Sequence, residues 1–145
     1  MPTNSTRTKN RVEVQYAVPR RGVPSAASLR KWAALVPSQA TLRIVGEREG
    51  RRLNNAFKKK NRATNVLSFA YGNGAGDVVL CHPLVVREAR AQGKAIAAHY
   101  AHLVVHGLLH LRGYDHEKKR EAERMARAEI RLLRRAGFGN PYTVK

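Results

Sequence analysis

The segment that most limits the possible fold runs from Ala101 to His116, A-H-L-V-V-H-G-L-L-H-L-R-G-Y-D-H. Its apolar residues surround His106 and His110, which are four residues apart and therefore lie one turn apart on one face of a helix. We expect such an apolar helix to be buried and rigid. Gly113 predicts its end, because glycine is the usual residue where a helix closes in a left-handed turn. The chain can then bring His116 back towards the other two histidines.

Three imidazoles that converge on one point predict a metal site. Three protein nitrogens with one open position form the ligand set of a catalytic zinc, which keeps a water as fourth ligand. We therefore expect His106, His110 and His116 to bind one Zn²⁺ ion. Nickel, copper and iron also accept imidazole nitrogens, so the identity of the metal stays open. His99 and His102 extend the same face, either as supporting or substrate-facing residues or as buried histidines bonded to their neighbours.

The charge of the chain indicates a polyanionic partner. Its 145 residues include 28 Lys and Arg but only 10 Asp and Glu, a formal net charge of +18. Such a charge attracts nucleic acid first and anionic membranes second. No apolar run approaches the ~20 residues that cross a bilayer, so we expect no membrane segment. The single cysteine, Cys81, excludes an intramolecular disulfide and is expected to be buried, which fits a reducing, cytoplasmic location.

Hydrophobic periodicity predicts an α+β fold, in which a small mixed β-sheet packs against helices and the histidines lie on a central buried helix and the following turn. The expected strands are 12–18, 41–46, 64–71 and 77–81, and the expected helices are 26–36, 47–60, 82–92, 94–111 and 117–136. Residues 77–81 are apolar enough for a central strand. We expect residues 1–10 to be a disordered basic arm and residues 11–145 to form a single domain.

Two charged segments allow more than one interpretation. In the helix at 47–60, Leu53, Ala56 and Phe57 form the expected apolar stripe, and the basic run 58–62 is either a solvated helix end or a phosphate-binding ridge. The helix at 117–136 has mixed charges and an inward stripe, typical of a solvated packing helix. That stripe consists of Ala122, Met125, Ala126, Leu132, Leu133 and Ala136.

Acidic residues near the expected site have several possible roles. Asp115 is a suitable cap for the helix that follows it, or it orients a histidine ligand, or it acts as a general base. Asp77 is a candidate base only if the fold brings it close. In metalloprotease helices a glutamate directly follows the first histidine as the base, and here that position is Gly107. A phosphodiester is therefore a better candidate substrate than a peptide.

The segment H-G-L-L-H-L-R-G-Y-D-H at 106–116 resembles the signature of the YbeY family of bacterial endoribonucleases, H-G-x-L-H-L-x-G-Y-D-H. The blocks A-T-N-V-L-S-F, G-D-V-V-L-C and A-H-Y-A-H-L-V-V-H-G also resemble family blocks, as does N-P-Y near the end. The likeness, from about Leu42 to Tyr142, implies a small mixed sheet with helices around a cleft. It also implies a zinc-dependent endoribonuclease specific for single strands, with its metal on His106, His110 and His116.

The same resemblance implies a biological setting. The family matures ribosomal RNA, notably the 3′ end of the small-subunit RNA, and takes part in ribosome quality control. The expected partners are therefore ribosomal RNA and ribosomal particles, with ribosomal or assembly-factor proteins as further partners.

One departure from the family concerns a residue expected to act on RNA. The family usually has Y-R-G-K-D before its T-N-V-L-S-F block, and its arginine is considered functionally important. Here the stretch is F-K-K-K-N, which puts Lys58 in the place of the arginine. Lysine keeps the charge but loses the two-pronged grip on phosphate. We expect Lys58 to be a catalytic cation and to bind RNA together with Lys59, Lys60 and Arg62.

Two other functions remain compatible with the residues. A non-catalytic ribosome-assembly factor would use the metal for structure and the charge for binding, and Lys58 in place of arginine favours this alternative. A metal hydrolase acting on a peptide or small amide is disfavoured by Gly107 and by the charge. Metal-dependent cleavage of single-stranded RNA distinguishes the endoribonuclease from both.

Overall fold

The computed structural model describes residues 10–143, so the arm predicted at 1–10 falls almost entirely outside the described residues. Asn10, predicted as the last residue of the arm, is the first residue of a strand. The strands are β1 (Asn10–Tyr16), β2 (Ser38–Val45), β3 (Val66–Gly72) and β4 (Ala75–Cys81). The helices are α2 (Ala26–Ala33), α3 (Glu47–Lys58), α4 (His82–Ala91), α5 (Ile96–Leu111) and α6 (Lys119–Arg135).

The strands form one mixed sheet in the order β1-β2-β4-β3, which confirms the predicted α+β class. β1 and β4 both run parallel to β2, whereas β3 runs antiparallel to β4. β4 is therefore an interior strand, as its apolar run predicted. Val78 and Leu80 belong to the main core, while Val79 and Cys81 belong to a smaller core on the opposite face. The burial of Cys81 is confirmed.

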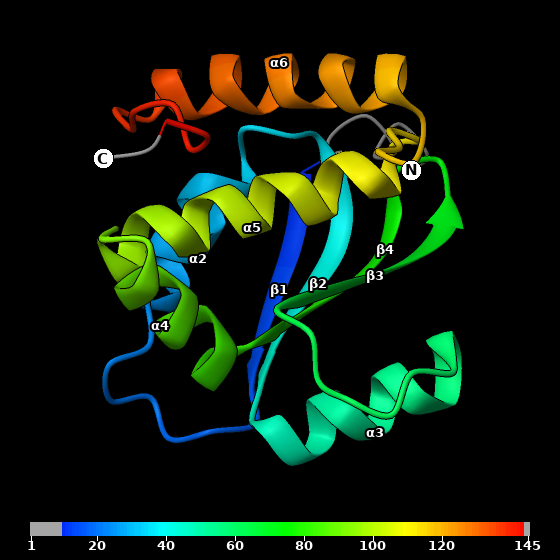
Figure 1. The fold of residues 1–145 in the computed structure, drawn as a ribbon, viewed down its shortest axis with the longest axis vertical. Helices are drawn as coiled ribbons and strands as arrows, with labels where there is room; N and C mark the ends of the chain where they lie inside the picture. The colour runs from blue at the N-terminus through cyan, green and yellow to red at the C-terminus, as the bar shows by residue number, and fades with distance from the viewer. Residues whose placement is uncertain (1–9, 144–145) are drawn as a thin grey trace, which may run out of the picture.

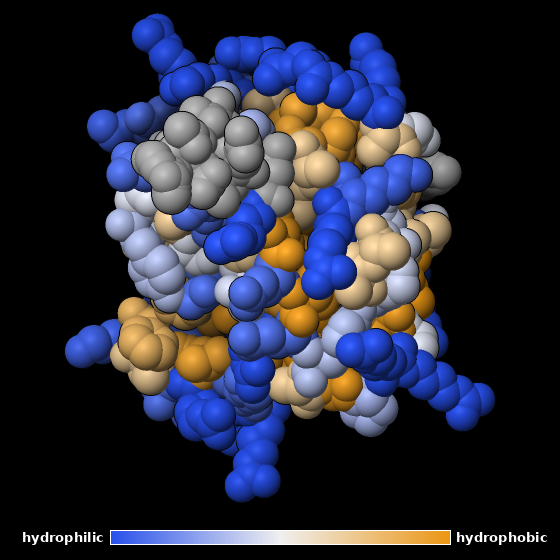
Figure 2. Space-filling model, turned by 180° about the vertical axis from the view of Figure 1, so that it is seen from behind, coloured by the Kyte–Doolittle hydropathy of each residue, from blue (hydrophilic) through white to orange (hydrophobic). Residues whose placement is uncertain are grey.

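The helices divide between the two faces of the sheet. α5 crosses one face, with α6 beside it on the outer side, and α3 lies apart from them at the other end of the sheet (Figure 1). Hydrophilic side chains project from around the whole molecule in the view of Figure 2, as the composition leads one to expect. Within residues 10–143, none of the helices combines the length and the apolarity needed to cross a membrane.

α3 packs differently from the prediction. Of the predicted stripe, Leu53 packs against the smaller core, but Ala56 and Phe57 are exposed. The buried residues of the helix are Gly50 and Asn54. The reason is a close approach of Gly50 to Cys81 in β4, which turns the face with Gly50 and Asn54 towards the sheet. The Asn54 amide also donates to the Arg62 carbonyl at 2.7 Å, which ties the end of the helix to the following loop.

The predicted role of Asp115 as the cap of the last helix is wrong. α6 begins after Lys118, whose side chain makes no capping hydrogen bond. Asp115 Oδ1 instead accepts hydrogen bonds from the backbone N–H groups of His116 at 2.6 Å and Glu117 at 3.2 Å. These bonds stabilise the turn that follows α5 rather than the start of α6.

Candidate metal centre

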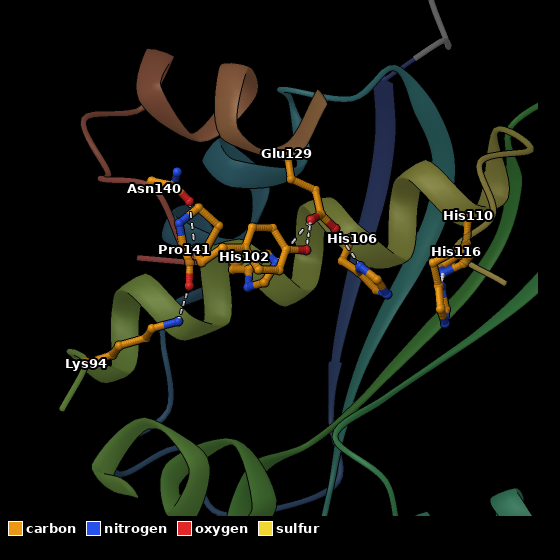
Figure 3. Close-up of polar contacts among 9 residues, drawn as sticks. Lys94, His102, His106, His110, His116, Glu129, Asn140 and Pro141 are labelled. Carbon is orange, nitrogen blue, oxygen red and sulfur yellow. Dashed lines mark hydrogen bonds and ion pairs between the residues drawn. The ribbon is translucent and has the colours of Figure 1, made fainter. Parts of the chain in front are cut away.

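The structure brings together the three histidines that the sequence predicted as ligands. His106 and His110 lie on α5, and His116 lies in the turn after it (Figure 3). One ring nitrogen from each histidine lies within 4.8 Å of the other two. His110 Nε2 and His116 Nδ1 are only 2.9 Å apart. Ring nitrogens this close point to a common centre.

The turn after α5 explains why His116 returns to the helix. Gly113 has a φ of +96°, a conformation that glycine adopts without strain. The Gly113 N–H donates to the His110 carbonyl at 3.0 Å, and the Tyr114 N–H donates to the Leu109 carbonyl at 3.1 Å. This pattern closes the last turn of the helix and reverses the chain.

The protonation state of His110 suits metal binding. Burial, followed by the neighbouring His106 and His116, lowers the pKa of His110 to about 4. His110 is therefore neutral at pH 7, the state in which imidazole binds a metal. Three imidazole nitrogens grouped at one point fit the ligand set of a catalytic zinc.

A buried carboxylate lies behind His106. Glu129 of α6 is 0% exposed, and its Oε2 is 2.5 Å from His106 Nδ1. Its Oε1 is 3.3 Å from His102 Nε2 and also accepts a hydrogen bond from the Tyr142 hydroxyl (Figure 3). Because His106 Nδ1 is engaged with Glu129, its Nε2 is left for a metal.

Glu129 is ionised despite its burial. Burial alone would raise the pKa of Glu129, but the hydrogen bonds with His102, His106 and Tyr142 outweigh burial and lower the pKa to about 2. A carboxylate bonded to the second nitrogen of a ligating histidine fixes the orientation of the ring and raises its basicity. The geometry gives Glu129 this role towards His106.

Sequence reasoning missed Glu129, although a signal was present. Glu129 lies on the apolar stripe of α6, four residues after Met125 and before the buried pair Leu132 and Leu133. A carboxylate at a core position of an amphipathic helix needs a buried partner. That requirement distinguishes Glu129 from the exposed acids of the same helix.

His99 is buried, His102 is partly buried, and both are bonded to carboxylates. His99 Nε2 is 2.8 Å from Glu88 Oε1, which also accepts a hydrogen bond from the Asn65 amide at 2.9 Å. His102 contacts Glu129, as described above. The sequence left two interpretations open for these residues. His102 fits the first, a supporting position beside the candidate centre. His99 fits the second, a buried histidine bonded to its neighbour.

The three histidines line a cleft of about 370 Å³, here called the histidine cleft. Lys58 and Asp115 line the same cleft. Lys59, Lys60 and Arg62, the other members of the predicted RNA-binding set, are exposed and do not line it. Asp77 lies on the opposite face of the sheet, where it accepts a hydrogen bond from Tyr71. The structure therefore brings Asp115 to the site, and not Asp77.

Gly107 explains why a metalloprotease base is absent from α5. A Cβ atom at this position would lie 2.7 Å from Val78 Cγ1 and 3.2 Å from Ser68 Oγ. The Ser68 hydroxyl also donates to the Gly107 carbonyl at 3.1 Å. The helix therefore lies so close to β3 and β4 that any side chain at this position would require Val78 to move.

Comparisons with known proteins identify related sequences over most of the chain. Residues 8–137 match the family model described as Endoribonuclease YbeY. A protein named Endoribonuclease YbeY from Aromatoleum aromaticum is 51% identical over 125 residues, which cover 82% of this chain and 81% of that protein. A relative of the same name from Xanthomonas axonopodis pv. citri is 47% identical, over 90% of this chain and 92% of that protein. Another, from Nitrosomonas europaea, is 42% identical, over 100% of this chain and 99% of that protein.

A solved structure shows the same fold. The solution structure of TM1509 from Thermotoga maritima superposes with a TM-score of 0.51 at 21% sequence identity. The match covers 91% of this chain and 99% of that one. The architecture is therefore shared over nearly the whole of both chains.

Proposed function

The chain belongs to the Endoribonuclease YbeY family and is an endoribonuclease, and on this basis we propose that it cuts single-stranded ribosomal RNA with one zinc ion held by His106, His110 and His116. The observation that carries the proposal is the convergence of three histidine nitrogens in a cleft that is also lined by Lys58. When bound, a zinc ion there would polarise a phosphoryl oxygen and lower the pKa of a bound water. The net charge of +18 supports a polyanionic substrate.

Three residues around the ligands have separate tasks in this proposal. Glu129 holds His106 in the orientation that leaves Nε2 for the metal. Asp115 holds the turn that presents His116. Lys58 places a positive charge near the phosphodiester, where it stabilises the negative charge that builds up on the phosphoryl oxygens.

The ammonium of Lys58 is positioned by a neighbouring ring. Its Nζ lies 5.9 Å from the centroid of the Phe69 ring, within the range of a cation–π contact. Lysine interacts with phosphate as a point charge, whereas arginine binds it through two parallel hydrogen bonds. Lys58 thus supplies the charge that the arginine supplies in the resembling family pattern. Lys59, Lys60 and Arg62 add charge for binding along the strand.

The biological setting of the proposal follows from the resemblance. We propose that the substrate is ribosomal RNA, with the 3′ end of the small-subunit RNA as the principal cutting region, in the cytoplasm and in ribosome quality control. Ribosomal particles and ribosomal or assembly-factor proteins are the proposed partners. The single domain over residues 11–145 holds the whole of the proposed site.

Cleavage of a single-stranded fragment of small-subunit ribosomal RNA tests the proposal. Wild-type protein is compared with His110→Ala and with His82→Gln, a matched histidine variant at the start of α4, outside the histidine cluster. Only His110→Ala should lose zinc and cleavage together. Identical purification of the three proteins guards against a contaminating nuclease.

Two results of this experiment would contradict the proposal. Equal cleavage by all three proteins would assign the activity to a contaminant. RNA binding without cleavage by any of them would favour the assembly-factor alternative.

The same experiment also tests which group attacks the phosphorus. Fragments that end in a 5′-phosphate would exclude attack by the RNA 2′-hydroxyl.

A further inference from the structure

The following inference rests on the proposed action on single-stranded RNA and concerns the face of the sheet opposite α5. There, Phe57, Phe69 and Tyr71 line a pocket of about 420 Å³, here called the aromatic pocket. Phe57 is 62% exposed and Tyr71 is 70% exposed, more than any other large apolar side chain in residues 10–143. Apolar surface lies among hydrophilic side chains at the lower left of Figure 2, over the end of the molecule that α3 occupies. Exposed rings grouped in a pocket mark a binding surface.

Strand β3 separates the aromatic pocket from the histidine cleft. Successive side chains of a strand point to opposite faces of the sheet. Ser68 and Ala70 line the histidine cleft, whereas Phe69 and Tyr71 line the aromatic pocket. Because β3 is the outermost strand beside β4, a strand of RNA can pass around its edge from one pocket to the other.

The last two residues of α3 also line different pockets. Lys58 lines the histidine cleft, and the preceding residue, Phe57, lines the aromatic pocket. The contact of Lys58 Nζ with the Phe69 ring places the cation beside the strand that separates the two. A cation that follows the backbone next to rings that stack with bases is the usual arrangement in proteins that bind single-stranded nucleic acid.

The rings of the aromatic pocket are held in place before any ligand binds. The β3–β4 register shifts between Ala70 and Gly72, so Tyr71 lies at a bulge, a feature that redirects a side chain. The Tyr71 hydroxyl donates to Asp77 Oδ2. The Phe57 and Phe69 rings meet edge to face, with centroids 5.3 Å apart. Rings already fixed in this way lose little freedom when a ligand stacks on them.

The charges inside the aromatic pocket indicate a neutral ligand group. Arg43 is the cation of the pocket, and Glu49 binds it at 2.7 Å while Gln15 binds it at 3.1 Å. Asp77 and Glu49 add negative charge to the lining. A phosphate would be repelled here, whereas an uncharged base would stack on the rings.

We infer that the aromatic pocket binds one unpaired base of the RNA strand that is cut in the histidine cleft. The sugar-phosphate backbone passes the β3 edge beside Lys58, and the base stacks on Tyr71 or Phe57. A base in a duplex is already paired and stacked and is not available to the pocket. The pocket therefore gives the enzyme a physical means of choosing single-stranded substrate.

Cleavage by the zinc-loaded protein of a single-stranded oligoribonucleotide tests this inference. The same oligoribonucleotide is also prepared with one abasic nucleotide, placed in turn at each position around the cut. Tyr71→Ala should raise KM by about 5- to 100-fold, the range expected for losing one stacked base. For the wild type, one abasic position should cause a similar rise. Combining that position with Tyr71→Ala should add nothing further, because both changes remove the same contact.

Matched variants separate stacking from other effects. Tyr71→Phe keeps the ring and should keep the wild-type KM, while Phe57→Leu keeps an apolar side chain without a ring and should raise KM. Zinc content should be unchanged in all of them. Tyr71→Trp adds an exposed indole to a chain whose native Trp32 is buried, and its fluorescence should be quenched by the oligoribonucleotide.

The outcomes distinguish this inference from the proposed function. An unchanged KM for Tyr71→Ala, or abasic and variant effects that add in full, overturns the inference while leaving the endoribonuclease intact, and a protein partner then becomes the candidate occupant. If the wild type itself does not cut RNA, both the proposed function and the inference fail.

Discussion

At the scale of single residues, the candidate metal centre depends on a carboxylate far away in the sequence. Glu129 contacts His106 across the boundary between α6 and α5. We predict that Glu129→Gln lowers zinc affinity about 10- to 100-fold, because the amide no longer orients His106 as an anion does. Competition with a chromogenic chelator measures the affinity. Glu123→Gln, an exposed change on the same helix, should leave it unchanged. Equal affinity for both variants would contradict a positioning role of Glu129.

Lys58 provides a second test at this scale. Lys58→Ala should reduce the cleavage rate about 100-fold or more, the usual effect of removing one group that stabilises a developing negative charge. Zinc content should stay at the wild-type level, since Lys58 is not one of the candidate ligands. Lys58→Arg should preserve cleavage. Lys60→Ala, an exposed change outside the histidine cleft, is the control. An equal loss of cleavage rate in this control would show that Lys58 is only one of several RNA-binding charges.

Three buried or partly buried histidines predict how the free energy of unfolding depends on pH. Burial lowers the pKa of His82 and His99, and burial with the neighbouring histidines lowers that of His110 to about 4. In the unfolded chain these groups return to about 6.5 and bind more protons than in the folded protein. The free energy of unfolding should therefore fall as the pH drops below about 6.5.

Urea unfolding of the metal-free protein at about pH 7.5 and about pH 5.5 measures this effect. Glu129, with a pKa of about 2, stays ionised over this window and does not contribute to the change. His82→Gln should make the decrease in stability smaller. A free energy of unfolding that is constant over the window would contradict the prediction.

At the scale of elements, the sequence predicted what depends on local pattern. The apolar run of β4 identified an interior strand, and Gly113 identified the end of α5 and hence the return of His116. The stripe of α3 was right only for Leu53, and the cap at Asp115 was wrong, because both depend on contacts made in three dimensions. Gly50 meets Cys81 only once the sheet has formed. Glu129 was missed for the same reason, since its histidine partners lie on another helix and Tyr142 lies in the segment after α6.

Gly107 supplies a prediction at the scale of elements. Gly107→Ala places a methyl group against Val78, which must move for α5 to keep its distance from the sheet. We expect a loss of about 1–3 kcal/mol in the free energy of unfolding, as in other overpacked cores. Gly139→Ala, where nothing lies within 4 Å of the added Cβ, is the matched control. Thermal and urea unfolding compare the two, and equal stability would show that α5 can shift freely.

At the scale of the whole molecule, the net charge of +18 should dominate the strength of RNA binding. Within residues 10–143, Arg43 and Arg87 are the only Lys or Arg residues that form ion pairs with carboxylates, so most of the cations described lack a carboxylate partner. For about five phosphate contacts, the affinity for single-stranded RNA should fall roughly 100-fold between about 50 and 200 mM salt. Fluorescence anisotropy measures the slope, with unfolding curves as a control for the fold. An affinity independent of salt would contradict electrostatic binding.

The three histidines all come from the end of α5 and the turn that follows it. An ion held there closes only a short loop of chain, and a short loop has little entropy to lose. Assembly of the sheet and its helices therefore does not have to wait for the ion. If the proposed site is right, a newly made chain would fold first and be loaded afterwards, and it would release and regain its metal without unfolding. The supply of metal in the cell would then set how many molecules are active, rather than how many survive.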